Sequence, residues 1–99
     1  MKHFLVDITY LVPVDDLTDI LPQHRTFLQK GYDQGWLLMS GPRLDKLGGI
    51  VICRAPSQDA LEAFFRDDPY AIHGVAIHRF VEFNPVKRQS WLENWVTED

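Results

Sequence analysis

The order of strand-like and helix-like patterns constrains the fold of this chain more than any other feature. Over residues 3–10, Phe4 and Val6 fall on one face and Leu5 and Asp7 on the other. This two-residue period is typical of a strand, whereas apolar spacings of three and four indicate a helix. The patterns predict a strand over 3–10, a helix over 17–34, strands over 36–40 and 48–54, a second helix that starts at Ser57 and ends before Pro69, and a strand over 75–83.

This order, β-α-β-β-α-β, predicts an α+β domain of the ferredoxin-like type, with one antiparallel sheet and both helices on one face. The other face, which carries Leu5, is left without helices. We expect a second copy to bury it, which gives a homodimer joined through the open sheet faces. We expect one domain over residues 1–99, with a core of about 3–86 and a tail over 87–99 whose Trp91 and Trp95 serve packing or the interface.

Composition excludes several classes of partner. The net charge is −4 and the only basic pair is Lys87-Arg88, so neither nucleic acid nor an anionic membrane surface is an expected partner. No apolar run is long enough to span a membrane, and Asp7 interrupts the start of the chain too early for a signal peptide. The single cysteine, Cys53, cannot form an internal disulfide, and in mid-strand it is expected to be an inert small hydrophobe. We therefore expect a cytoplasmic protein.

His24 is the first candidate functional residue. At about 100° per residue it falls in the middle of the apolar stripe that contains Leu21 and Phe27. An imidazole that faces inward needs a partner or a cavity. In a ferredoxin-like order the end of the second helix approaches the first helix, so Asp68 can reach His24. Such a pair could act as a general base, with Asp68 orienting the ring. Spacing alone favours a core histidine bonded to a backbone carbonyl, with Asp68 capping its own loop.

Other candidates carry weaker signals. His73 and His78 do not share a face at metal-ligand spacing, so we predict no metal site. Ser40 precedes Gly41-Pro42 and could donate a hydrogen bond into a cleft, but it lacks the strand–turn–helix setting of a nucleophile.

Several short motifs, in this order and at these separations, resemble the YCII-related (YciI-like) family. They are Gln23-His24, the run over 37–42 that ends in Ser40-Gly41-Pro42, the Asp67-Asp68-Pro69-Tyr70 segment, and Gly74-Val75. The resemblance covers roughly residues 3–86. It implies a small ferredoxin-like protein related to the dimeric α-β barrel fold, and it therefore supports the expected homodimer. The tail beyond Pro85 is not part of the family pattern.

The resemblance also implies a site. The family's polar pair falls on His24 and Asp68, which become the catalytic residues, and Gly41, Pro42 and Tyr70 match positions that frame the site. Ser40 stands where alanine is commonest and would make the pocket more polar. One family member removes chloride from a hydroxyhydroquinone. The resemblance thus implies a cofactor-free lyase, isomerase or dehalogenase step on a small phenolic or cyclic substrate.

Two other functions stay open. The same pocket could bind a small molecule in a non-catalytic or accessory homodimer, with the His–Asp pair serving recognition or the fold. A monooxygenase of the related α-β barrel type, acting on quinone precursors, shares the architecture, although its sequence signals are not visible here.

Overall fold

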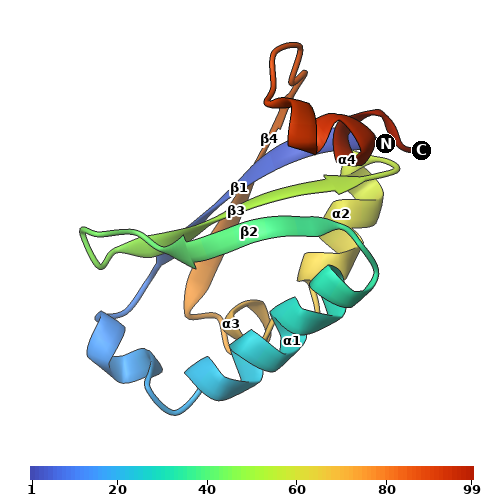
Figure 1. Ribbon diagram of the computed structural model, residues 1–99. Helices are drawn as coiled ribbons and strands as arrows, with labels where there is room; N and C mark the ends of the chain where they lie inside the picture. The colour runs from blue at the N-terminus through green and yellow to red at the C-terminus, as the bar shows by residue number, and fades with distance from the viewer.

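A computed structural model describes residues 1–99 as a four-stranded sheet with helices against it (Figure 1). The strands are β1 (Lys2–Tyr10), β2 (Leu37–Pro42), β3 (Gly48–Ala55) and β4 (Ala76–Phe83). The α-helices are α1 (Leu21–Asp33), α2 (Gln58–Phe65), α3 (Pro69–Ile72) and α4 (Glu93–Thr97), and two 3₁₀ turns are η1 (Val14–Leu17) and η2 (Ser90–Leu92).

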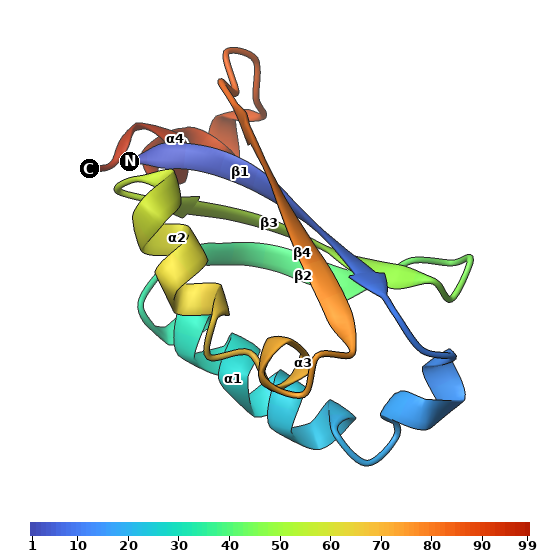
Figure 2. The same ribbon diagram turned by 180° about the vertical axis from the view of Figure 1, so that it is seen from behind.

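The sheet has the strand order β2-β3-β1-β4, and every neighbouring pair is antiparallel. In its central part Val6 of β1 lies opposite Val51 of β3 and Phe80 of β4. Figures 1 and 2 show α1, α2 and α3 on the same side of the sheet. This arrangement confirms the predicted ferredoxin-like α+β fold. None of the helices is both long and apolar enough to cross a membrane.

The core lies between the sheet and these helices. Alternate residues of β1, namely Phe4, Val6 and Ile8, are almost completely buried, as the two-residue period requires. Phe27 of α1 and Leu61 of α2 pack into the same cluster. Where α1 passes β2 it carries Gly31, and a Cβ there would lie 2.7 Å from the side chain of Leu37. The small residue therefore permits a close approach of helix and strand.

Helix α1 is shorter than the predicted helix over 17–34. It begins at Leu21, after the separate turn η1. The reason is Pro22, whose ring cannot follow the carbonyl four residues earlier in a continuous helix. The helix ends where Gly35 adopts a φ of 80°, a conformation that favours glycine.

Two further local predictions need correction. The second strand was predicted over 36–40, but β2 continues through Gly41 and ends at Pro42, which the sheet tolerates because β2 is an edge strand. The third helix, α3, follows directly after the predicted end of α2 and was not predicted. Its N-cap is Asp68 and its first residue is Pro69, which suits that position because its missing N–H would have no helical partner.

The tail crosses to the opposite face of the sheet, near the N-terminus (Figure 1). The ring of Trp95 lies 5.4 Å from His3 and 5.0 Å from the guanidinium carbon of Arg54. Arg54 also donates to the carbonyls of Gly35 and Trp95. The rest of that face carries exposed or half-buried apolar side chains: Leu5, Met39, Ile50, Ile52, Ile77, Val81 and Phe83.

Candidate functional site

Three hydrogen-bond donors converge on the completely buried carboxylate of Asp68. Nδ1 of His24 lies 2.8 Å from Oδ1, and the backbone N–H of Tyr70 donates to the same oxygen over 3.0 Å. Nε2 of His78 lies 2.8 Å from Oδ2. The three donors come from α1, α3 and β4. Asp68 therefore joins three separate elements at one point of the core.

These donors decide the charge of Asp68. Burial alone would raise the pKa of this carboxyl group, because the charged form loses its hydration. The hydrogen bonds from His24, His78 and the backbone of Tyr70 outweigh burial and lower the pKa to about 2. Asp68 is consequently ionised at neutral pH and can only accept hydrogen bonds. The imidazole nitrogens that face it therefore carry hydrogens.

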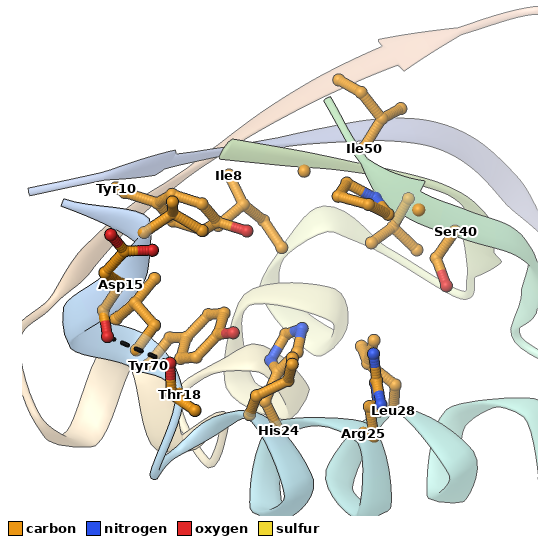
Figure 3. Close-up of a pocket in the computed structure, with 17 residues that line it drawn as sticks. Ile8, Tyr10, Asp15, Thr18, His24, Arg25, Leu28, Ser40, Ile50 and Tyr70 are labelled. Carbon is orange, nitrogen blue, oxygen red and sulfur yellow. Dashed lines mark hydrogen bonds between the residues drawn. The ribbon is translucent and has the colours of Figure 1, made fainter. Parts of the chain in front are cut away.

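His24 is held on two sides. Besides its bond to Asp68, its ring is stacked on Tyr70, with centroids 3.9 Å apart and planes 7° from parallel. Only 8 % of the residue is exposed, and that edge borders a cavity (Figure 3). Because Nδ1 donates to Asp68, the neutral ring has its lone pair on Nε2, the nitrogen that points into the cavity.

Asp68 makes the contacts that both sequence interpretations required of it, while a catalytic role stays a prediction. It contacts His24, and it also caps α3 through the Tyr70 N–H. The alternative for His24 is wrong in its chemistry, because the partner of Nδ1 is a carboxylate and not a backbone carbonyl.

The cavity beside His24 has a volume of about 390 Å³. That size is within the usual range for small-molecule sites. Its walls come from β1, η1, α1, β2, β3 and α3, so it lies between the first helix and the sheet. Apolar side chains such as Ile8, Leu21 and Leu28 form much of the lining. A few polar groups, shown in Figure 3, interrupt this surface.

Two phenols are among these polar groups. Tyr10 and Tyr70 both line the cavity and meet edge to face at 5.9 Å. Burial raises the pKa of Tyr70 to about 12, with Tyr10 and the charge of Asp68 acting in the same direction. Burial also raises the pKa of Tyr10. Both phenols are thus protonated at neutral pH and can donate hydrogen bonds to a ligand oxygen.

The other residues singled out from the sequence lie around the same cavity. Ser40, Gly41 and Pro42 line it from β2, and Figure 3 shows Ser40 across the cavity from His24. The hydroxyl of Ser40 shares a 2.6 Å hydrogen bond with the phenol of Tyr32. Asp68 is the exception, because it lies behind His24 and does not reach the cavity.

Sequence reasoning missed His78, Tyr10 and Arg25. The side chain of His78 is only 7 % exposed and was weighed only as a metal ligand. Its strand offered a better signal, since Ala76, His78 and Phe80 alternate toward the helices. Arg25 lines the cavity next to His24, and no hydrogen bond or ion pair engages its side chain.

Two further observations concern metal ligands and Cys53. No group of three or more His, Cys, Asp and Glu side chains is arranged to hold a metal ion. Cys53 is completely buried, and burial raises the pKa of its thiol to about 12. It therefore stays a thiol and behaves as a small hydrophobe.

The fold and the cavity together define a small α+β domain with a buried His–Asp pair beside a ligand-sized pocket. The sequence matches the YCII-related domain over residues 4–84, so the chain belongs to the YCII-related family. The tail with Trp91 and Trp95 lies beyond the match.

A solved structure with the same fold is the 5-chloro-2-hydroxyhydroquinone dehydrochlorinase from Burkholderia phenoliruptrix AC1100, in complex with 2,5-dihydroxybenzoquinone. The TM-score is 0.67, the sequence identity is 19 %, and the alignment covers 89 % of this chain and 93 % of that chain. At this identity the likeness establishes the fold alone. No curated protein sequence matches this chain significantly.

Proposed function

We propose that this protein is a small enzyme in which His24 acts as a general base on a phenolic or other cyclic substrate. The reaction would be a lyase, isomerase or dehalogenase step. One observation carries the proposal. Nδ1 of His24 is bonded to a buried, ionised Asp68, while the opposite edge of the ring borders the cavity. In a base of this kind the carboxylate fixes the tautomer of the imidazole and the orientation of its ring toward the cavity.

The chemistry follows from the charges. When Nε2 of His24 takes a proton from the substrate, the imidazolium that forms lies 2.8 Å from the Asp68 carboxylate, which stabilises it. The phenols of Tyr10 and Tyr70 can donate to oxygens of the substrate as negative charge develops there. The apolar lining excludes water and strengthens these interactions.

The similar solved structure indicates one reaction of this type. Its enzyme is named for the removal of hydrogen chloride from a chlorinated hydroxyhydroquinone. Such an elimination takes one proton and one chloride ion from the substrate. In this chain His24 would accept the proton, and the C–Cl bond would break as its electron pair leaves with chloride. A cavity of about 390 Å³ suits a one-ring compound of this kind.

Arg25 narrows the class of substrate. Its side chain faces the same space as His24 (Figure 3), and its positive charge acts to lower the pKa of Tyr70. Since no carboxylate of the chain pairs with it, Arg25 favours a ligand that carries a negative charge, such as a phenolate.

The expected homodimer is part of the proposal. The apolar face opposite the helices, with Ile77 and Val81 exposed, is the surface that a second copy would cover. The docked tail occupies one end of that face and would border the interface. A cytoplasmic location also belongs to the proposal, because the lone Cys53 thiol requires no oxidising compartment.

A non-catalytic ligand-binding protein is the second candidate. The observation that favours it is the cap of α3, which gives Asp68 a role in the fold independent of any reaction. In this case the cavity would bind a small aromatic molecule without converting it.

The test uses 5-chloro-2-hydroxyhydroquinone and measures the release of chloride. In His24→Asn the amide nitrogen replaces Nδ1 and keeps the bond to Asp68, while the base at Nε2 is lost. We expect this change to lower turnover by roughly 100-fold or more. His73→Asn is the matched control, because His73 is exposed after α3 and does not line the cavity.

Unchanged turnover in His24→Asn would show that His24 is not the base. Binding of 2,5-dihydroxybenzoquinone without any chloride release would support the second candidate. An NMR titration of the His24 ring in the wild type and in Asp68→Asn adds an independent measurement. A coupled pair predicts that the titration midpoint falls in the variant.

A further inference from the structure

A second imidazole shares the carboxylate of Asp68. His78 enters the core from β4, and its Nε2 lies 2.8 Å from Oδ2. Its place follows from the sheet register, in which His78 lies opposite Ile8, a residue that is 2 % exposed on the helix-covered face. The family motifs do not include this position, and His78 does not line the cavity.

We propose that His78 is a positioning residue that divides the negative charge of Asp68 between two imidazoles and thereby sets the basicity of His24. This inference rests on the proposed role of His24 as the base. His78 acts through Asp68 and makes no contact with the substrate.

The geometry explains how the division works. Oδ1 accepts from His24 and from the Tyr70 N–H, so Oδ2 would face the core without a partner if His78 were absent. The hydrogen bond from His78 fixes the plane of the carboxylate, which keeps Oδ1 directed at His24. It also neutralises part of the charge that would otherwise stabilise a proton on His24.

Proton counting gives the direction of the effect. With Asp68 ionised and both rings neutral, the three side chains carry a charge of −1. Protonation of His24 during a reaction brings this charge to 0. If His78 already carries a second proton, the charge is 0 beforehand and protonation of His24 brings it to +1, which a single buried carboxylate stabilises poorly. His78 therefore reduces the negative charge that is available to stabilise a proton on His24.

Few other charges act on this cluster. Phe65 of α2 packs on the His78 ring at 5.4 Å and contributes no charge. Tyr70 of α3 stacks on His24, and the charges of Tyr10 on β1 and Arg25 on α1 act on Tyr70. All three stay unchanged in the variants proposed below.

Three substitutions separate positioning from packing. His78→Phe keeps an aromatic ring against Phe65 and removes the donor. His78→Gln places an amide N–H near the position of Nε2 and keeps the donor. His78→Asn is a shorter matched control whose amide corresponds to Nδ1 and does not reach Oδ2.

The readout is the NMR titration midpoint of the His24 ring in each variant. We expect a higher midpoint in His78→Phe and in His78→Asn than in the wild type, and a midpoint near the wild-type value in His78→Gln. The acid limb of the pH–rate profile should move in parallel with the midpoint. Equal midpoints in His78→Gln and His78→Asn would overturn the proposal. The comparison of these two variants tests the proposal even if His78→Phe does not fold.

The ring titration requires no substrate, so it separates this inference from the proposed function. The expected midpoints without any conversion of a phenolic compound would support the charge sharing and contradict the proposed reaction. Normal turnover with identical midpoints would keep the reaction and reject the role of His78.

Discussion

The imidazole of His24 lies flat against the phenol ring of Tyr70, with 3.9 Å between the ring centroids. Tyr70 also supplies the N–H that holds Oδ1 of Asp68. One residue of the short helix α3 thus supports the candidate base from its face and orients the carboxylate behind it. This explains how a four-residue helix can contribute to the site as much as the long helix α1.

This contact predicts different results for two substitutions of Tyr70. Tyr70→Phe keeps the stack and the backbone N–H but removes the hydroxyl from the cavity. We expect an almost unchanged free energy of unfolding and an affinity for 2,5-dihydroxybenzoquinone lower by about tenfold, the value of one hydrogen bond of roughly 1.4 kcal/mol. Urea unfolding and calorimetric titration measure the two quantities.

Tyr70→Leu is the matched comparison. It removes the ring from a residue that is 2 % exposed, so we expect a loss of about 3 kcal/mol in the free energy of unfolding. If Tyr70→Phe destabilised the protein as strongly as Tyr70→Leu, the hydroxyl would serve the fold and not the cavity.

Asp68 predicts a specific dependence of stability on pH. Its pKa in the folded protein is lowered to about 2, from an ordinary value of 3.8. A lowered carboxyl pKa stabilises the fold above the ordinary value, and this stabilisation is lost as the pH falls through the folded value. The difference corresponds to about 2 kcal/mol, lost between about pH 4 and pH 2.

The measurement is the free energy of unfolding of the wild type and of Asp68→Asn over this pH range. Other carboxylates contribute to both proteins, so the difference between the two curves isolates Asp68. We expect the wild type to be more stable by about 3 kcal/mol at pH 7, because the variant leaves the donors of His24 and His78 without a charged partner. The gap should narrow in acid, and a constant gap would contradict the assigned ionisation.

The Trp95 contact predicts that the tail stabilises the domain. Trp95 covers Arg54, which is 5 % exposed, and His3, whose Nε2 is buried without a hydrogen-bond partner. We expect Trp95→Ala to lower the free energy of unfolding by about 2 kcal/mol through lost aromatic packing and the lost cation–π contact. Trp91→Ala is the control, since Trp91 is 73 % exposed and should change stability by less than about 0.5 kcal/mol.

Periodicity was sufficient for most of the fold, because each strand and helix buries one regular stripe. It failed where local chemistry competes with the pattern. Pro22 moved the start of α1 to Leu21, although the apolar stripe continues backward to Leu17. β2 extends past the predicted 36–40 to end at Pro42, and a proline is tolerated there because β2 is an edge strand, which only the assembled sheet defines.

The site was predictable to the extent that single elements display it. His24 interrupts an apolar helical stripe, and that interruption is visible in the sequence. His78 interrupts a strand face in the same way, but in the sequence analysis Asp68 was already paired with His24. Sequence spacing does not reveal that one carboxylate can accept from two rings. The contribution of Tyr10 and Arg25 needs the cavity itself, which forms from six elements.

The open sheet face gives the prediction for assembly. Val81 of the edge strand β4 lies opposite Leu5 on this face and is 37 % exposed. An aspartate at this position would place a charge within the proposed interface, which a dry contact between two sheets cannot accommodate. We expect the wild type to be a dimer at micromolar concentration and Val81→Asp to be a monomer, measured by light scattering.

Leu44→Asp is the control, because Leu44 is 99 % exposed in the loop between β2 and β3 and its substitution should leave the dimer intact. A wild-type monomer would remove the second copy from the proposal, and the titration and binding experiments on His24 would be interpreted for a single chain.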